Sequence, residues 1–304
     1  MGGCGKTHRV LTDKGYKNIL YTALCWSLVA DCINKYGVKG FSINTVAGID
    51  CRPVCEEQGI TPGVVIVDEA TMNSQELMNH IKNIHPYSQF IVIGDMDELG
   101  NPYQCAGVNF NGFNMKPYKY IKADQIDFRA MGCLKLQTLK QQLREITKKY
   151  YQHKKNITNP FVLQGIRERY INEMKTIIRK NINIGDLNDY DYINDIIIVS
   201  TNKQIEEYNE MWCHFPKFKM IKQARVNIYK RIFGGKDYII NGEYTNLIDI
   251  NGTDLRHAST CHSVQGLTCE GQIFIDLNNM FDINQIYTAI SRARNINQIR
   301  YIEN

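Results

Sequence analysis

The chain lacks the long apolar runs, the export signal and the low-complexity tracts that mark several large classes of protein. No apolar run approaches the roughly 18 residues that a membrane span requires, which argues against a transmembrane protein. The amino terminus lacks the basic-then-apolar pattern of a signal peptide, and the run Gly2-Gly3-Cys4-Gly5-Lys6 lacks the Ser or Thr of a myristoylation site. We therefore expect an intracellular protein, in the cytoplasm or nucleus, and in a host cell if the gene is viral.

The sequence also offers no evident disulfide framework or zinc site. Its 10 cysteines are scattered along a chain without an export signal, so reduced thiols are expected. Cys51 and Cys55 are the closest pair, but a zinc site needs two further ligands, and His80 and His85 lie far along the chain. Buried or inert thiols are the favoured interpretation.

What is present is the composition of a globular protein large enough for two domains. The chain has 304 residues, of which 43% are hydrophobic and 22% charged, and it exceeds the size at which single cores usually stop growing. The formal net charge of +5 suits a polyanionic partner without requiring one. Lys148-Lys149 and Lys154-Lys155 can meet phosphates, although lysines on a helix are more often a solvated face. A Lys-, Asn- and Ile-rich composition favours an AT-rich genome, such as a viral one.

Short apolar runs alternate with amphipathic stretches through residues 16–128, which is typical of a parallel α/β sheet. The expected strands are 18–21, 64–67 and 90–93, and the expected helices are 24–36 and 71–84. A long charged helical segment follows over 134–180, interrupted at Asn159-Pro160 because the residue before proline is biased away from helix.

The second half repeats the α/β pattern. A strand is expected over 196–200, a helix over 203–212 and a further strand over 272–276. Residues 216–255 instead alternate in polarity and carry Gly-Gly and Asn-Gly turn signals, which predicts a small β-rich insertion.

The run Gly3-Cys4-Gly5-Lys6-Thr7 has the residue types that end a phosphate-binding loop. Backbone N–H groups at Gly3 and Gly5 can close around phosphates, Lys6 can reach the terminal phosphates and Thr7 can hold magnesium. The full pattern also requires an earlier glycine and a preceding strand, which are absent from this chain. We therefore expect that the chain is part of a longer polypeptide and binds nucleotide weakly by itself.

A second acidic element supports the phosphate-binding interpretation. The apolar run Val64-Val65-Ile66-Val67 ends in Asp68-Glu69. At the end of a strand, Asp68 can hold magnesium, while Glu69 can orient or deprotonate the water that attacks the γ-phosphate. The alternative is an acidic strand end with a capping role.

With these motifs and those that follow them, the chain resembles a superfamily 1 helicase of the RecD-like type over nearly its whole length. The resemblance implies two RecA-like P-loop domains, at about 1–125 and 126–304, with the first strand of the first domain missing. It also places a small β-barrel-like module that grips nucleic acid at residues 216–255.

The third motif departs from the family at one position. The run 93–99 resembles the family motif Gly-Asp-x-x-Gln-Leu, so Asp95 is expected to face the nucleotide. Glu98 occupies the position at which the family has a glutamine that senses the γ-phosphate. A carboxylate there would be repelled by a triphosphate. Gln104 is a candidate substitute for this glutamine, but it does not lie at the motif position. The run 127–130 resembles the arginine motif that opens the second domain, so Arg129 would face the γ-phosphate.

The most specific resemblance lies near the carboxyl terminus, in the runs 260–268 and 287–294. In the family the first couples nucleotide to nucleic acid, through residues that match His262, Gln265 and Gly266. The second supplies an arginine finger, here Arg292, with Arg294 as the less favoured alternative. A planar guanidinium suits this role because it spreads charge over γ-phosphate oxygens.

The contacts to nucleic acid are less sharply marked. Thr22 and Thr45 resemble the single-strand-binding motifs, where hydroxyls and backbone amides meet phosphates, although each alone is more often a turn or helix cap. Exposed aromatics can stack on bases, but most aromatics in such a domain are core, and none is singled out among Trp26, Tyr103, Phe110 and Phe113.

Together these observations predict an ATP- and Mg²⁺-dependent helicase that moves along single-stranded DNA, or RNA, with the 5′-to-3′ polarity of RecD-like relatives. Its expected partners are replication proteins or an upstream domain of the same polypeptide. No association with a membrane is expected. One alternative is a nucleotide kinase or another ATPase that acts on small molecules, but this hypothesis does not account for the motifs within residues 262–294. The serious alternative is a degenerate helicase remnant that binds nucleic acid without ATP turnover.

Overall fold

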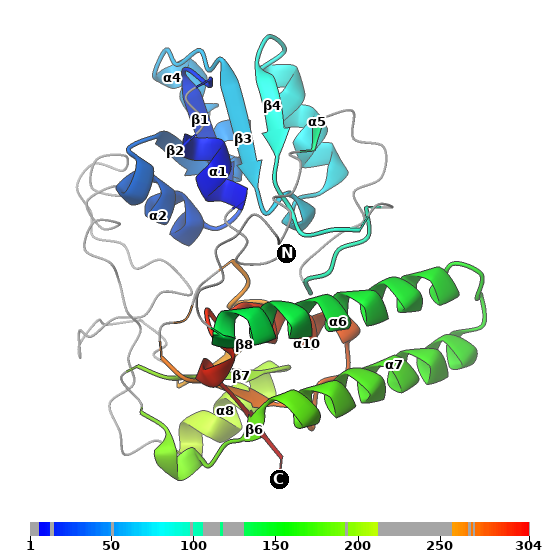
Figure 1. Ribbon diagram of the computed structural model, residues 1–304. Coiled ribbons are helices and arrows are strands. Elements are labelled where there is room, and N and C mark those ends of the chain that lie inside the picture. The colour runs from blue at the N-terminus through cyan, green and yellow to red at the C-terminus, as the bar shows by residue number, and fades with distance from the viewer. Residues whose placement is uncertain are drawn as a thin grey trace.

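The computed structural model describes residues 6–12, 15–49, 52–97, 100–105, 116–117, 131–191, 194–211, 257–266, 269 and 271–303. Within them the chain forms two 5-stranded sheets whose described strand pairs are all parallel, and helices flank both sheets (Figure 1). The expected α/β class is therefore confirmed. The expected boundary near residue 125 and the insertion at 216–255 lie outside the described residues.

The first sheet has the strand order β2-β1-β3-β4-β5. Its strands are β1 (Ile19–Ala23), β2 (Lys39–Ser42), β3 (Val64–Asp68), β4 (Gln89–Val92) and β5 (Lys116–Pro117). Its helices are α1 (Lys6–Thr12), α2 (Trp26–Tyr36), α3 (Ile43–Ala47), α4 (Val54–Glu57), the 3₁₀ turn η1 (Ala70–Met72) and α5 (Gln75–Ile84). Because the strands are parallel, their carboxyl ends share one edge of the sheet.

Alternate residues of β3 point to opposite faces of this sheet, as the period of two in a strand requires. Val64 and Ile66 pack in one cluster with side chains of α1 and α2, while Val65 and Val67 pack in another with α3 and α5. Both faces are thus covered, which explains why the strand is apolar throughout.

The second sheet has the order β6-β10-β9-β7-β8. Its strands are β6 (Asn183–Ile184), β7 (Ile196–Val199), β8 (Ala258–Thr260), β9 (Ile273–Asp276) and β10 (Ile299–Ile302). Its helices are α6 (Met131–Lys154), α7 (Pro160–Asn181), α8 (Asn202–Met211) and α10 (Ile283–Ser291), with 3₁₀ turns η3 (Leu187–Asp189) and η4 (Ile296–Gln298).

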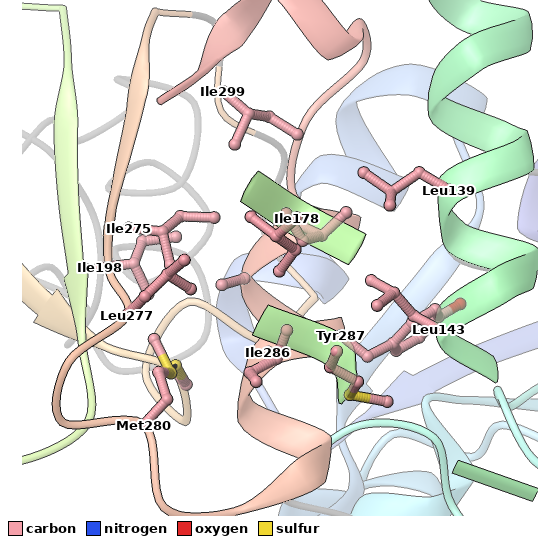
Figure 2. Packing of buried hydrophobic residues seen from close by; sticks show 14 of the residues in the cluster. Leu139, Leu143, Ile178, Ile198, Ile275, Leu277, Met280, Ile286, Tyr287 and Ile299 are labelled. Carbon is pink, nitrogen blue, oxygen red and sulfur yellow. Dashed lines mark hydrogen bonds between the residues drawn. The ribbon is translucent and has the colours of Figure 1, made fainter. Parts of the chain in front are cut away.

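The largest core lies between this sheet and the helices α6, α7 and α10. Figure 2 shows Leu139 and Leu143 of α6 and Ile286 and Tyr287 of α10 converging in this core, which also takes in Ile198 of the sheet. A smaller cluster with Ile205 and Tyr208 of α8 covers the opposite face. All nine residues of α10 are buried, so this helix is enclosed on every side.

The expected helices are confirmed, with shifted boundaries. The break at Asn159-Pro160 is real, because the Asn159 side chain accepts hydrogen bonds from Phe161 N and Val162 N and so caps α7. The helix expected over 71–84 is instead a 3₁₀ turn followed by α5, because Ser74 caps α5 by accepting from Leu77 N. The helix expected from residue 24 begins at Trp26.

Candidate nucleotide-binding site

Helix α1 and strand β3 bring the hydroxyl of Thr7 to the carboxylate of Asp68. Thr7 Oγ1 donates to Asp68 Oδ2 at 2.7 Å. Tyr21 Oη donates to the same oxygen at 2.7 Å, and Glu69 N donates to Asp68 Oδ1 at 2.9 Å. Burial and then the neighbouring Asp68 carboxylate raise the pKa of Tyr21, which keeps its hydroxyl a donor. Three residues far apart in sequence, Thr7, Tyr21 and Asp68, therefore form one oxygen-rich group.

The next residue, Glu69, has a strained backbone. Its φ of 46° lies in the left-handed region, which non-glycine residues adopt at a cost and which clusters at functional sites. Ala70 N donates to Ile93 O at 2.8 Å and ties this turn to the segment after β4.

The Glu69 carboxyl is in an unusual environment. The residue is partly buried, but its Oε2 atom is enclosed and has no hydrogen-bond partner among the described residues. Burial and then the Asp68 carboxylate raise the pKa of Glu69, while Lys6 and Arg292 oppose this effect. A carboxylate with a raised pKa in such a position has the properties of a general base.

Asp95, after β4, connects the first sheet to helices of the second. The side chain is 1% exposed and accepts a hydrogen bond from Tyr287 Oη of α10 at 2.7 Å. It also forms an ion pair with Arg144 of α6, with 2.9 Å between Nη1 and Oδ1. Burial alone would raise the pKa of Asp95, but surrounding positive charges, Lys6 and Arg144 among them, and the Tyr287 hydroxyl hold it below its ordinary value. Tyr103 stacks on Arg144, with 4.1 Å from the guanidinium carbon to the ring centre.

Arg292 directly follows α10 and reaches back to the first half of the chain. Its side chain is 4% exposed, and Nη2 donates to Gln104 Oε1 at 2.9 Å. Nη1 donates to Val264 O at 3.3 Å, and Nε donates to Thr288 O at 3.0 Å. Gln104 thus lies beside the expected arginine finger, although its position in the motif is unusual. Arg294 donates its backbone N–H to Gln298 Oε1 at 2.8 Å.

The loop after β8 packs against helix α2. Gly266 has φ of 83°, and a Cβ atom there would lie 2.8 Å from Leu28 Cδ1, so both the backbone and the close approach favour glycine. Gln265 is buried, and its Oε1 lies 3.8 Å from Cys105 Sγ, which donates to it weakly. These two residues therefore lie where the halves of the chain meet.

The three residues expected at nucleic acid differ in their surroundings. Thr22 is fully buried and its Oγ1 has no partner among the described residues, so its hydroxyl does not reach the surface. Thr45 takes part in a helix cap, since its backbone N–H donates to Ser42 Oγ at 3.3 Å. His262 is exposed. Only His262 is thus fully open to solvent.

Several expected site residues lie outside the described part of the chain. They are Gly3, Gly5, Glu98 and Arg129. The residues that sequence reasoning missed are Arg144 and Tyr287, whose contacts to Asp95 cross between the halves. One sequence signal could have indicated Arg144. Lys140 and Arg144 are charged residues on the same face of α6 as the buried Leu136, Leu139 and Leu143, and a charged residue on a buried face needs a partner.

The two parallel sheets flanked by helices match the RecA-like domains of helicases. Solved structures that share this fold include Pif1 helicases. One is Bacteroides Pif1 in complex with ADP-AlF3 and ssDNA, at 15% identity and a TM-score of 0.57 over 99% of this chain and 86% of that one. Another is Candida albicans Pif1, at 12% identity and 0.51 over 98% and 94%. A third, from a study of DNA unwinding at forked dsDNA by two coordinating Pif1 helicases, has 15% identity and 0.55 over 99% and 86%.

At these identities the likeness establishes the fold. No family model matches the sequence, and no curated protein matches it. In the part of the chain that is described, no helix has both the length and the apolar character needed to cross a membrane. Across the same residues, no group of three or more His, Cys, Asp or Glu side chains is arranged to hold a metal ion.

Proposed function

We propose that the chain is an ATP-driven motor that moves along single-stranded nucleic acid, a superfamily 1 helicase of the 5′-to-3′ type. The observation that carries this proposal is the bond between Thr7 of α1 and Asp68 of β3, next to Glu69, whose carboxyl lies close enough to Arg292 of the second half for the positive charge to oppose the rise in its pKa that burial causes. Hydrolysis between two RecA-like units requires such a division of the catalytic groups, because closure then becomes a condition for reaction.

The oxygen donors fit Mg²⁺ with a nucleotide. A hydroxyl and a carboxylate 2.7 Å apart are hard ligands, and Mg²⁺ is usually held by one or two carboxylates together with substrate phosphates and water. When bound, Mg²⁺ would neutralise developing phosphate charge. Thr7 and Asp68 would hold it, Lys6 would bind the terminal phosphates, and Glu69 would orient and deprotonate the attacking water.

Arg292 would act as the arginine finger. Its acceptors among the described residues include Gln104 Oε1, Val264 O and Thr288 O, which are neutral. A γ-phosphate carries negative charge and can accept two parallel hydrogen bonds from the guanidinium, so it would compete with these neutral acceptors. Gln104, released by this exchange, would sense the γ-phosphate in place of the glutamine that the family carries at position 98.

Single-stranded DNA is the proposed track. This is supported by the shared fold, since the Bacteroides Pif1 structure holds ssDNA, and by the net charge of +5. His262 and Thr45 follow the carboxyl ends of β8 and β2 and would contact phosphates. Motion would follow from closure on ATP and release after hydrolysis.

The test is ATP hydrolysis by the full chain with and without an oligothymidine strand. We expect stimulation by the strand, and a loss of at least about 100-fold in kcat for both Glu69→Gln and Arg292→Ala. Arg9→Ala is the matched control, because Arg9 is exposed on α1, next to the site but outside it. DNA binding without turnover would favour the helicase remnant, and unchanged hydrolysis in both variants would refute the assigned roles.

A further inference from the structure

The far end of the α6–α7 hairpin carries a surface that the nucleotide site does not use. Helix α6 ends at Lys154 and α7 begins at Pro160, so residues 148–162, here called the tip, lie together at one end of the hairpin (Figure 1). Lys140 Nζ, which donates to Ala293 O beside Arg292, is 14 residues earlier, and the end of α6 therefore lies about 20 Å further along the helix axis. The tip is separate from the candidate site.

The tip is held in place by specific contacts. Tyr170 of α7 is buried, and its hydroxyl hydrogen-bonds His153 Nδ1 at 2.7 Å. The rings of Tyr150 and Tyr170 meet edge to face with 6.1 Å between their centres. Backbone bonds from Lys155 N to Tyr151 O and from Ile157 N to Lys154 O close the turn. The side chains at the tip are therefore presented by an ordered scaffold, which limits the entropy cost of binding.

The tip is strongly basic. It contains 4 lysines and no Asp or Glu, and the nearest acidic residues in sequence are Glu145 and Glu168. Lys149, Lys154 and Lys155 are exposed. This is the density of positive charge that meets the phosphates of a nucleic acid backbone.

Beside these lysines the tip exposes two apolar side chains. Phe161 is 82% exposed and Val162 is 50% exposed. The other apolar side chains of α7 pack into or against the core, so these two do not serve the fold; the packed ones are Leu163, Ile166, Tyr170, Ile171, Met174, Ile177 and Ile178. An exposed aromatic ring among lysines matches the composition of surfaces that bind single strands by stacking, without sequence preference.

We infer that the tip is a second contact for single-stranded nucleic acid, in which Lys149, Lys154 and Lys155 neutralise phosphates and Phe161 stacks on a base. The inference rests on the proposed function only for the identity of the polymer. Its geometry is independent of ATP, and it extends the path of the strand beyond the two sheets.

The experiment measures binding of the full chain to a fluorescent oligothymidine strand over a range of salt concentrations. In the variant Lys149→Ala/Lys154→Ala/Lys155→Ala we expect the slope of log K against log salt to become shallower by about 2, since each single-strand phosphate contact contributes about 0.7. The matched control is Lys82→Ala/Lys135→Ala/Lys180→Ala, which removes the same charge from exposed lysines away from the tip. It should leave the slope within about 0.5 of wild type.

Phe161→Leu tests stacking separately from charge. Binding to oligothymidine should weaken about 5-fold or more, while binding to an abasic oligonucleotide of the same length should not change. All these positions are exposed, and a thermal unfolding midpoint equal to that of wild type verifies folding.

The outcomes separate this inference from the proposed function. If the tip variants bind like wild type while DNA-stimulated ATP hydrolysis persists, the tip inference is wrong and the motor stands. If wild type binds no strand at all, both fail. If polyglutamate competes as well as the oligonucleotide at equal charge and Phe161→Leu has no effect, the tip is a contact for acidic protein and the inference is overturned.

Discussion

Replacing Arg144 by methionine should destabilise the fold substantially, because it would remove the ion pair with Arg144 from the buried Asp95 carboxylate. Asp95 is 1% exposed and the Arg144 side chain 15% exposed. Removing one partner of a buried pair costs about 3–5 kcal/mol. Tyr287 and the nearby charge of Lys6 remain with Asp95, so we expect the lower end, about 3 kcal/mol.

The assay is urea unfolding followed by circular dichroism, in a double-mutant cycle with Asp95→Asn. Asparagine removes the charge but can still accept from Tyr287, so the double variant should recover part of the loss, with a coupling energy of about 2 kcal/mol. Arg179→Met is the control, since the Arg179–Glu303 pair lies on the surface and should contribute no more than about 1 kcal/mol.

The same pair predicts a pH dependence. The pKa of Asp95 is depressed in the folded state, so its contribution to stability is complete above the unfolded value near 3.8 and is lost as the pH falls through the folded value. In Arg144→Met the folded pKa rises, and this acid-side loss should shift to higher pH. A cost below about 1 kcal/mol with no coupling would refute the reasoning.

Three further predictions follow from single contacts. In wild type, ATP hydrolysis should fall on the acid side of its pH–rate profile at a pH above 4.5, the ordinary pKa of a glutamate, because the pKa of Glu69 is raised and the base must be ionised. Glu69→Gln should remove this acid-side fall. If the fall persists in the variant, Glu69 is not the base. Ser74→Ala should lower the free energy of unfolding by about 1 kcal/mol through loss of the cap on Leu77 N, and an unchanged urea midpoint would contradict this. Gly266→Ala should lower the free energy of unfolding by about 1–3 kcal/mol. When Leu28→Ala is added, the total loss should be smaller than the sum of the two single losses, because this change removes the atom 2.8 Å from the new Cβ. Strict additivity would argue against the clash.

Local features were predictable because they depend on neighbours in sequence. The apolar run 64–67 formed β3 since a strand buried on both faces needs no polar alternation. Asn159-Pro160 interrupted the helical segment because it combines a capping side chain with a ring suited to the first helical turn. The cap at Ser74 carried the same kind of signal, and it explains why the helix expected from residue 71 begins later.

The candidate site was predictable only in part. The pairing of Thr7 with Asp68 follows from known motif chemistry, and the structure brings these residues together. The contacts of Asp95 depend on where α6 and α10 pack, and no local pattern specifies that Arg144 should face it. Burial of Thr22 likewise follows from its place in the middle of the sheet between β2 and β3, which its neighbours in sequence do not encode.

The enclosure of α10 has a consequence for how the two sheets can separate. Tyr287 and Arg292 lie five residues apart on or directly after this helix, and each contacts the first half of the chain, through Asp95 and Gln104. Since every residue of α10 is packed, the helix moves as one solid piece with its own sheet. A rigid-body separation of the two sheets would therefore break both bonds in the same motion, whereas transfer of Arg292 onto a γ-phosphate would break only the bond to Gln104.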